Sequence, residues 1–338
     1  MTKLFVTGGA GFIGSAFVRQ MLDLFPACEI TNFDALTYAG NPDNLEGLDK
    51  SRHRFVHGDI ADREAVLAAL DEGTDAIINF AAESHVDRSI ASADDFLRTN
   101  IVGTQALLDS ARSKGVRRFL HVSTDEVMGA LSDDADAFFT EASPFAPNSP
   151  YAASKAAAEH FVRAAHHTFG LDTIVTRCGN NYGPRQFPEK LIPLIISNAL
   201  HDEPVPVYGD GLYTRDWIYV EDHCRAIQLA LEKGTSGAVY NIGARNERRN
   251  IEVVESILQA LGKPRSLIRY VKDRPGHDRR YAIDPALAER ELDWRPVETW
   301  ESGLEKTIRW YAENNSWLER ARSGAYRDYY AQQYGAQI

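Results

Sequence analysis

A glycine-rich turn near the amino terminus constrains the fold of this chain more than any other feature. The apolar segment 4–6 predicts a buried strand, which runs directly into Thr-Gly-Gly-Ala-Gly-Phe-Ile-Gly at 7–14, where a helical pattern begins. Because Gly8, Gly11 and Gly14 lack side chains, backbone N–H groups and the helix amino terminus can approach a pyrophosphate. This strand, turn and helix predict a dinucleotide-binding unit.

A carboxylate at the end of the next predicted strand supports this interpretation. Asp34 follows the apolar segment 30–33, where it can accept hydrogen bonds from a ribose diol and would repel a 2′-phosphate. The sequence therefore predicts NAD rather than NADP, whereas a glycine turn that only connects strand to helix would not require this acid. Asp59 and Ile60 come after the third predicted strand and could border the adenine. Asp59 or Asp62 could equally be a helix N-cap.

Short apolar runs alternate with helix-period segments through the first half of the chain. Such alternation is typical of a parallel sheet with helices on both faces, so we predict an α/β protein with a Rossmann-type doubly wound parallel sheet. The predicted strands are 4–6, 30–33, 55–57, 76–80 and 119–122, and the predicted helices between them are 12–24, 64–70 and 96–111.

The regular alternation of predicted strands and helices ends in the second half of the chain. A Pro/Ser/Asn stretch at 143–150 precedes a helical pattern from about 151 to 168 and a further strand at 171–176. Later elements are expected to be shorter and interrupted by proline, as in a domain whose loops grip a substrate. For the 338 residues we expect an NAD-binding domain over 1–180, to which later segments return, and a smaller α/β domain over 181–338 that mainly binds substrate. The tail at 320–338 is expected to be peripheral.

Composition excludes several classes of protein. No apolar run approaches the length of a membrane span, and the amino terminus lacks the basic and apolar regions of a secretion signal. Cys28, Cys178 and Cys224 are odd in number and form no C-x-x-C pair, which favours a reducing compartment and a cytoplasmic location. We predict no metal site.

The net charge of −11 argues against nucleic acid or an anionic membrane as a partner. An anionic small substrate would need local positive charge. Arg274, His277, Arg279 and Arg280 could supply it, with Arg215 and Lys190 elsewhere in this half, although each could also be a solvated surface residue.

Residues 151–155, Tyr-Ala-Ala-Ser-Lys, place a phenol and an ammonium on one face of the predicted helix. A tyrosine with an ordinary pKa of about 10 is a poor base at neutral pH, and a nearby cation favours its phenolate. Tyr151 and Lys155 can therefore take a proton from a hydroxyl while NAD takes the hydride. The same spacing occurs by chance on surface helices, but the dinucleotide motif upstream favours catalysis.

Polar residues follow the strand predicted at 119–122, and ligands of open parallel sheets bind at such ends. Thr124 could hydrogen-bond the reacting oxygen. Burial and like-charge repulsion between Asp125 and Glu126 would raise one pKa, so that one carboxyl acts as an acid while the other acts as a base. Alternatively, the two carboxylates form a helix-entry cap. Residues 127–129, Val-Met-Gly, show no helical pattern, which favours the catalytic interpretation.

Taken together, these motifs resemble those of the extended short-chain dehydrogenase/reductases and, among them, the dTDP-glucose 4,6-dehydratases. The resemblance extends over nearly the whole chain, and the Thr-Asp-Glu run and the DRPGHD stretch are specific to the narrower family. Besides the glycine motif and the Tyr/Lys pair, it covers AAESHVDRS at 81–89, STDEV at 123–127, NSPY at 148–151, NNYGP at 180–184, FPEKLIP at 187–193, YGDG at 208–211, RDW at 215–217 and DRPGHD at 273–278.

The resemblance implies a role for each catalytic residue. Tyr151 would be the base in oxidation at C4, Thr124 would bind the C4 oxygen, Glu126 would remove the C5 proton and Asp125 would protonate the departing C6 hydroxyl. A ketone at C4 acidifies C5–H, elimination of water gives an enone, and the hydride returns to C6, which regenerates NAD in each turnover.

The resemblance also implies a homodimer and two sets of contacts. The cofactor set is Gly8, Gly11, Phe12, Ile13, Gly14, Asp34, Thr37, Asp59, Ile60, Ala81, Ala82, Ser84, Thr99, Tyr151, Lys155 and Asn181. The substrate set is Ser84, Thr124, Asn180, Lys190, Leu191, Pro206, Tyr208, Arg215, Asn250, Asp273, Arg274 and His277, and the segments 206–208 and 273–277 would line the nucleotide pocket.

Three residues depart from the family pattern. Met128 and Arg185 stand where tyrosine is frequent, and Gly179 where a small polar residue is more usual. They leave substrate preference and rate open, although packing substitutions that the fold tolerates would also explain them.

Two rival functions remain. An epimerase or decarboxylase acting on a nucleotide sugar would share NAD, Tyr151 and Lys155, but would not need Asp125 and Glu126. A non-catalytic NAD sensor on the same fold would be expected to have lost these groups. The choice between thymine and uracil, the pathway that uses the product and the number of subunits are not determined by the sequence.

Overall fold

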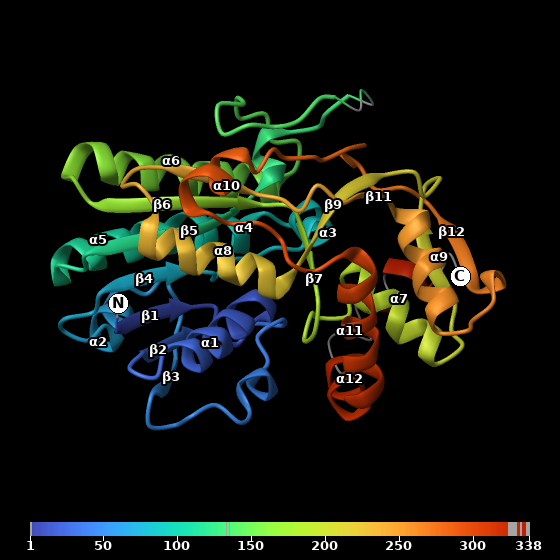
Figure 1. Cartoon of the computed structure of the whole chain (residues 1–338), viewed down its shortest axis with the longest axis horizontal. Coiled ribbons are helices and arrows are strands. Elements are labelled where there is room, and N and C mark those ends of the chain that lie inside the picture. Colours follow the sequence, from blue (N-terminus) through green and yellow to red (C-terminus); the bar gives the residue numbers. More distant parts are fainter. Residues whose placement is uncertain (1, 133, 135, 324–329, 332, 336–338) are drawn as a thin grey trace.

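The computed structural model describes residues 2–132, 134, 136–323, 330, 331 and 333–335 (Figure 1). Its strands are β1 Lys3–Thr7, β2 Glu29–Asp34, β3 His53–His57, β4 Ala76–Asn79, β5 Arg118–Thr124, β6 Asp172–Cys178, β7 Asn180–Tyr182, β8 Val205–Tyr208, β9 Thr214–Tyr219, β10 Val239–Ile242, β11 Glu247–Arg249 and β12 Ile268–Val271. Its α-helices are α1 Phe12–Leu24, α2 Arg63–Ala69, α3 Val86–Ala91, α4 Asp94–Phe96, α5 Thr104–Lys114, α6 Pro150–Phe169, α7 Leu191–Leu200, α8 Val220–Lys233, α9 Asn250–Ala260, α10 Ala286–Leu292, α11 Trp300–Glu313 and α12 Asn315–Ala321. The 3₁₀ and π-helical turns are η1 Pro42–Leu45, η2 Leu97–Gly103, η3 Asp125–Met128 and η4 Arg265–Leu267.

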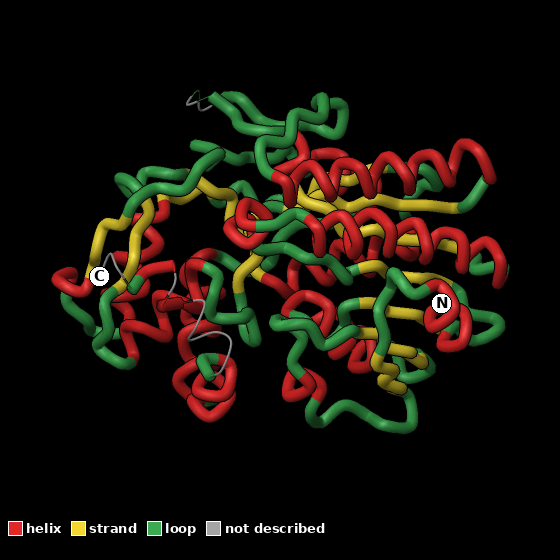
Figure 2. Tube along the Cα trace, turned by 180° about the vertical axis from the view of Figure 1, so that it is seen from behind, coloured by secondary structure: helices red, strands yellow, loops and turns green. Residues whose placement is uncertain are grey.

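The larger sheet of the described chain contains seven strands, all paired in parallel, in the order β10-β6-β5-β4-β1-β2-β3. Side chains alternate between its faces. Leu4 and Val6 pack with α1, α8 and α10 on one face, whereas Phe5 packs with α2, α5 and α6 on the other. Figures 1 and 2 show helices stacked on both faces. The predicted Rossmann-type doubly wound fold is confirmed.

A second group of elements lies beside the carboxyl ends of these strands (Figure 1). It contains a three-stranded sheet, β11-β9-β7, and a two-stranded sheet, β12-β8. Helices α7, α9, α11 and α12 pack around a core rich in aromatic side chains, including Tyr182, Trp217, Trp300 and Tyr311. The chain passes back to the larger sheet in α8 and β10 before it returns to this group.

Several sequence expectations were wrong in detail. Residues 96–111 do not form one α-helix, because a π-helical turn, η2, separates α4 from α5. Residues 125–128 do form a 3₁₀ turn, in which the Thr124 hydroxyl accepts a hydrogen bond from the Glu126 backbone N–H. Helices α8 and α11 have 14 residues each, so not every later element is short.

The carboxyl-terminal tail is also less peripheral than expected where the structure describes it. Tyr334 is buried against Leu194 and Val271, and its hydroxyl lies 3.3 Å from that of Tyr208. These contacts join residues far apart in the chain, which local sequence patterns do not reveal. Within the described residues, no helix is sufficiently long and apolar to cross a membrane.

Candidate active site

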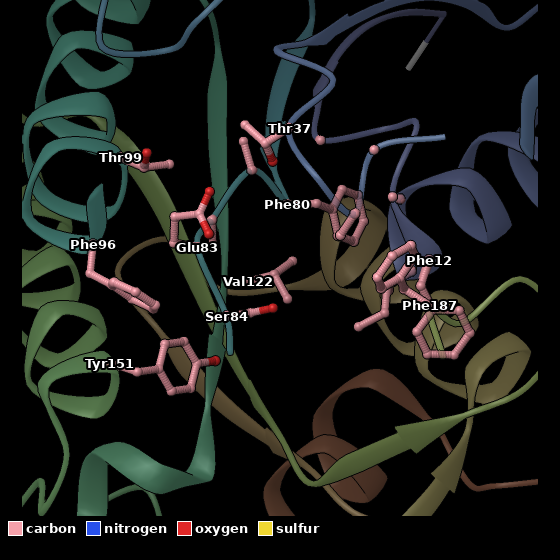
Figure 3. A pocket seen from close by; sticks show the side chains of 18 of the residues that line it. Phe12, Thr37, Phe80, Glu83, Ser84, Phe96, Thr99, Val122, Tyr151 and Phe187 are labelled. Carbon is pink, nitrogen blue, oxygen red and sulfur yellow. The ribbon is translucent and has the colours of Figure 1, made fainter. Parts of the chain in front are cut away.

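A cavity of about 1130 Å³ opens at the carboxyl ends of β1, β2, β4, β5 and β6. One end is formed by the glycine turn and the residues that follow β2, and the other by side chains from β5, α6 and the second group of elements. Figure 3 shows the Tyr151 phenol directed into this space from α6, with Phe12 and Phe187 on the other side. The cavity lies where open parallel sheets bind their ligands.

The glycine turn fits a pyrophosphate because side chains are excluded from it. A Cβ at Gly14 would lie 2.2 Å from the Gly8 carbonyl oxygen, and one at Gly8, where φ is +70°, would lie 2.6 Å from the Ala81 nitrogen. Gly11 is the N-cap of α1 and provides no side-chain cap. The first-turn amides can therefore serve an anion.

Asp34 lies at the end of β2 and lines the same part of the cavity. Its two oxygens accept backbone hydrogen bonds from Ala10 and Leu36, both at 2.8 Å, which fix the carboxylate in place while lone pairs remain for a ligand. Of the two interpretations left open for the next acid, Asp62 is the N-cap of α2, and Asp59 lines the cavity instead, bonded by Arg98 at 2.7 Å.

Asp125 and Glu126 both line the cavity. Asp125 is 2% exposed; its Oδ1 accepts from the Thr124 hydroxyl at 3.3 Å, and its Oδ2 has no hydrogen-bond partner among the described residues. Burial raises the pKa of Asp125 well above its ordinary value, and the charge of Glu126 adds to this effect.

Burial also raises the pKa of Glu126, but Arg274, Arg215 and Lys190 act to lower it. The two carboxyls thus stand in different electrostatic surroundings. After burial, the main influence on Asp125 is the charge of Glu126, whereas the main influences on Glu126 are cations, of which Arg215 acts on both carboxyls. This difference favours a protonated Asp125 beside an ionised Glu126, as expected of an acid and a base that work together.

Tyr151 and Lys155 lie on one face of α6, which begins with Ser149 as N-cap and Pro150 in its first turn. The expected lowering of the tyrosine pKa by the lysine is not found. Burial raises the pKa of Tyr151 well above its ordinary value, and the charge of Glu126 raises it further. The Lys155 amine donates to the Val122 carbonyl oxygen at 2.7 Å.

The predicted contact residues divide into two groups. The cavity is lined by every residue of the predicted cofactor set and by five of the predicted catalytic and substrate residues beyond it, Thr124, Asp125, Glu126, Asn180 and Lys190. The remaining predicted substrate residues lie outside its lining: Leu191, Pro206, Tyr208, Arg215, Asn250, Asp273, Arg274 and His277.

Some of this second group adjoins the cavity through Asp87, which lines it. The carboxylate of Asp87 binds the Tyr208 hydroxyl at 3.1 Å and Arg274 at 3.3 Å. His277 does not supply positive charge, because burial and Arg274 lower its pKa to about 3. Its ring stacks on Tyr213 with centroids 3.6 Å apart.

Two other members of the expected positive cluster form ion pairs with nearby carboxylates. Arg279 pairs with Asp210 on the surface. Arg280 pairs with Glu247 at 2.6 Å and donates to loop carbonyls. The positive charge near the carboxyl pair therefore comes from Arg215, Arg274 and Lys190.

Sequence reasoning missed a cluster at the cavity wall in which only Glu189 is fully buried. Glu189 lies 3.5 Å from Arg88, whose guanidinium stacks over the Tyr38 ring. Burial raises the pKa of Glu189 to about 7. Arg88 and Glu189 belong to motifs that the family resemblance singled out, but Gln333, which also lines the cavity, carries no such signal.

The three departures from the family pattern have different surroundings. Met128 is buried in a core with Val127 and Phe139 and does not line the cavity. Arg185 adopts φ +68° and lies over Trp310, also outside the lining. Gly179 lines the cavity, and a Cβ there would lie 2.8 Å from the Asp216 carbonyl oxygen, so the backbone itself favours glycine.

Across the described chain, no group of three or more His, Cys, Asp or Glu side chains is arranged to hold a metal ion.

The chain is similar to known proteins over nearly its full length. Residues 5–307 match the family model described as GDP-mannose 4,6 dehydratase. A dTDP-glucose 4,6-dehydratase of Xanthomonas campestris is 52% identical over 97% of this chain and 98% of its own length. One of Salmonella typhimurium is 48% identical over 98% of this chain and 99% of its own.

Solved structures give the same picture. The dTDP-glucose 4,6-dehydratase DesIV of Streptomyces venezuelae, solved with NAD and TYD bound, has a TM-score of 0.92 at 51% identity and covers 95% of this chain and 100% of its own. A Thermus thermophilus UDP-glucose 4-epimerase complex with NAD has a TM-score of 0.85 at 30% identity, over 93% and 100% of the two chains.

Proposed function

The chain belongs to the dTDP-glucose 4,6-dehydratases, and from this premise we propose how its cavity carries out the NAD-dependent conversion of dTDP-glucose to dTDP-4-keto-6-deoxyglucose and water. The observation that carries the proposal is the Asp125/Glu126 pair, which lies in the same cavity as Tyr151. A nucleotide-sugar epimerase would need the tyrosine but would have no use for the two additional proton-transfer groups, Asp125 and Glu126.

NAD is the cofactor, and when bound it accepts a hydride from C4 of the sugar and later returns it to C6. The turn at Gly8, Gly11 and Gly14 holds its pyrophosphate, and Asp34 binds a ribose diol. Because Asp34 already accepts two backbone hydrogen bonds, its carboxylate stays in one orientation. This fixed negative charge disfavours a 2′-phosphate.

Oxidation at C4 uses Tyr151 and Thr124. Tyr151 takes the proton of the C4 hydroxyl, and the Thr124 hydroxyl binds the C4 oxygen. A hydrogen bond from Thr124 acts to lower the pKa of Tyr151, against the effect of burial. Thr124 therefore acts to favour the phenolate, while burial and the charge of Glu126 act against it.

Elimination uses the two carboxyls. Glu126 removes the proton at C5, which the C4 ketone has acidified, and Asp125 gives its proton to the C6 hydroxyl as water leaves. The raised pKa of Asp125 supports its role as the acid, and the three cations around Glu126 support its role as the base. Glu126 then holds a proton that can return to C5 when C6 receives the hydride.

The nucleotide is proposed to bind beyond the sugar, where Tyr208, Asp87 and Arg274 form a connected set. Pro206, Asp273 and His277 belong to the segments 206–208 and 273–277 that are expected to line the nucleotide pocket, and Asn250 is expected to contact the nucleotide sugar. Lys190 donates to the Ser84 carbonyl oxygen at 2.8 Å, which joins the two walls of the cavity near the sugar.

Mass spectrometry of the product tests the function. Purified protein incubated in parallel with dTDP-glucose and UDP-glucose should convert dTDP-glucose to a product that has lost one water, without added reductant. A product that retains its water would favour an epimerase, and net accumulation of NADH would favour a simple dehydrogenase. Faster conversion of UDP-glucose would overturn the proposed nucleotide preference.

We also propose a homodimer and a cytoplasmic location. Leu97 and Val102 of η2 and Phe161 of α6 are 42% or more exposed, and these two elements pack together. A helical surface with exposed apolar side chains is suited to a second copy of the chain. Light scattering after size exclusion should give twice the chain mass, and Val102→Glu should shift the protein towards monomer.

The proposed cytoplasmic location rests on the cysteines. Cys28, Cys178 and Cys224 are buried free thiols, consistent with a reducing compartment.

A further inference from the structure

A short helical segment near the carboxyl terminus brings three polar side chains to one face. Residues 330, 331, 333 and 334 are helical. Because side chains three and four positions apart on a helix are neighbours, Tyr330, Gln333 and Tyr334 lie on the same side of this segment. The ring centroids of Tyr330 and Tyr334 are 5.1 Å apart. The tail therefore presents two phenols and one amide to the elements that it packs against.

The tail packs against the strand pair that carries Tyr208. Tyr334 is 4% exposed and lies in an apolar cluster with Leu194 of α7 and Val271 of β12. Val271 is the register partner of Tyr208 of β8. Burial of the large Tyr334 ring is favourable and holds the tail in this place. The tail therefore lies beside the segment 206–208, which is expected to line the nucleotide pocket.

The hydrogen bonds of the Tyr208 hydroxyl join the tail to the cavity. A phenol has one proton to donate and two lone pairs that can accept. The proton goes to the Asp87 carboxylate at 3.1 Å, because an ionised carboxylate can only accept. The Gln333 amide donates to the same hydroxyl at 2.7 Å, and the Tyr334 hydroxyl, at 3.3 Å, is left to donate as well. A reversed Gln333 amide would compete with Asp87 for the one proton. Asp87 and Gln333 both line the cavity.

Tyr208 remains a phenol at neutral pH. Burial raises the pKa of Tyr208 to about 12, and the charge of Asp87 adds to this effect, whereas the hydrogen bonds from Tyr334 and Gln333 act to lower it. Protein groups thus use the proton and both lone pairs of the hydroxyl. A nucleotide can meet the ring of Tyr208, while the hydroxyl serves to hold that ring in place.

We propose that Gln333 and Tyr334 are positioning residues, which hold the Tyr208 side chain in the orientation that binds the nucleotide of the substrate. The proposal rests on the proposed function, in which Tyr208 belongs to the nucleotide pocket. Asp87, which receives the proton of Tyr208, also binds Arg274 at 3.3 Å. The tail therefore completes a connected set of side chains that reaches the cavity. Loss of its contacts should weaken binding of the nucleotide and leave the chemical step unchanged.

Calorimetry with dTDP alone, on NAD-loaded protein, tests this role without turnover. Tyr334→Phe keeps the buried ring and removes only the hydroxyl, and Gln333→Leu keeps a side chain of similar size and removes the amide. Each variant loses one hydrogen bond to Tyr208, so the Kd for dTDP should rise by about fivefold. With dTDP-glucose, KM should rise by a similar factor while kcat stays close to the wild-type value. An unchanged Kd in either variant would overturn the role of that residue.

Tyr330→Phe is the matched control on the same face of the tail. The Tyr330 hydroxyl accepts a hydrogen bond from the Asn198 amide at 2.9 Å, and neither residue lines the cavity. This variant should bind dTDP as tightly as the wild type does. An equal loss of affinity in Tyr330→Phe and Tyr334→Phe would show that any loosening of the tail weakens binding, and would overturn the proposal.

A double-mutant cycle shows whether the tail acts through Tyr208. Tyr208→Phe removes the hydroxyl that Gln333 and Tyr334 hold. In this background, neither Gln333→Leu nor Tyr334→Phe should weaken dTDP binding further, because the energies of interacting residues are not additive. A loss of affinity that persists undiminished in the Tyr208→Phe protein would contradict the positioning role.

The outcomes separate this proposal from the proposed function. If the variants bind dTDP less tightly but the wild type does not dehydrate dTDP-glucose, the proposed function fails while the role of the tail stands. If the wild type dehydrates dTDP-glucose and the variants bind dTDP normally, only the role of the tail fails. A wild-type protein that binds no dTDP would overturn both.

Discussion

The two ends of the cavity differ in the kind of residue that forms them. The cofactor end depends on side chains that are absent, since Gly8 and Gly14 leave the backbone close enough for a pyrophosphate. The sugar end depends on buried titratable groups, Asp125, Glu126 and Tyr151, whose pKa values are all raised by burial. Changes at the sugar end should therefore alter rate, and changes at the cofactor end should alter affinity.

The largest effect is expected from Tyr151→Phe, which removes the phenol and keeps the ring packed against Phe96. Removal of a general acid–base group typically lowers kcat by roughly 10²–10⁴. NAD binding, measured by calorimetry, should be unchanged. Tyr240→Phe is a matched control, because the Tyr240 phenol is bonded to Glu291, outside the cavity lining. A Tyr151→Phe enzyme with normal turnover would show that the Tyr/Lys spacing is accidental.

Substitution of either carboxyl should lower the rate of dehydration by roughly 10²-fold or more, but the two substitutions should block different steps. In Glu126→Gln the C4 ketone should form, but C5–H should exchange with deuterated solvent much more slowly than in the wild type. In Asp125→Asn that exchange should survive while loss of water slows.

A 6-fluoro substrate, whose leaving group needs no proton, should restore much of the activity of Asp125→Asn. The measurements are deuterium uptake at C5 and release of water or fluoride. Rapid C5 exchange in Glu126→Gln, or equal failure of Asp125→Asn on both substrates, would reverse or remove these assignments.

The pH dependence of kcat/KM should follow from the same pair. Glu126 must be ionised, so the rate should fall by about tenfold per unit as pH drops below its pKa. That limb should lie above the ordinary glutamate range, because burial raises the pKa. Asp125 must be protonated, so the rate should fall again as pH rises through its pKa, which is raised further. Asp125→Asn should remove the alkaline limb and leave the acid limb, and an alkaline limb that persists would assign it to another group.

A smaller effect is expected at the cofactor end. Asp34→Asn removes the charge that favours a ribose diol but keeps the side-chain volume, and should weaken NAD binding by about tenfold. Binding of NADP should improve relative to NAD, while kcat at saturating NAD stays close to the wild type. Asp62→Asn is the control, since Asp62 only caps α2 and asparagine also caps. A fall in kcat at saturation in Asp34→Asn would contradict the separation between the two ends.

The strand, turn and helix of the cofactor end could be predicted from the sequence because their signals are local. A strand, a glycine turn, a helix and the carboxylate Asp34 lie within one stretch of chain, and all of the predicted cofactor residues line the cavity. The parallel sheet followed for the same reason, since alternating apolar runs report burial directly.

The sugar end was predicted less completely because its properties depend on distant contacts. The sequence suggested that Lys155 would lower the pKa of Tyr151, but its amine is turned towards Val122 and His121. His277 was expected to carry charge, and burial keeps it neutral. The approach of Tyr334 to Tyr208 joins the tail to the region beside the cavity, and no periodicity in the sequence reports such a contact.

The position of β10 in the larger sheet has a consequence for synthesis on the ribosome. β6 pairs with β5 on one side and with Val239–Ile242 on the other, so its second edge has no partner until the chain beyond β9 and α8 has emerged. At roughly 5–20 residues per second, the roughly 60 residues between Cys178 and Val239 take about 3–12 s to translate. During that interval the nascent chain presents an open strand edge, the type of surface that pairs with other chains. Fragments that stop before residue 239 should therefore aggregate or bind chaperones more strongly than the full chain.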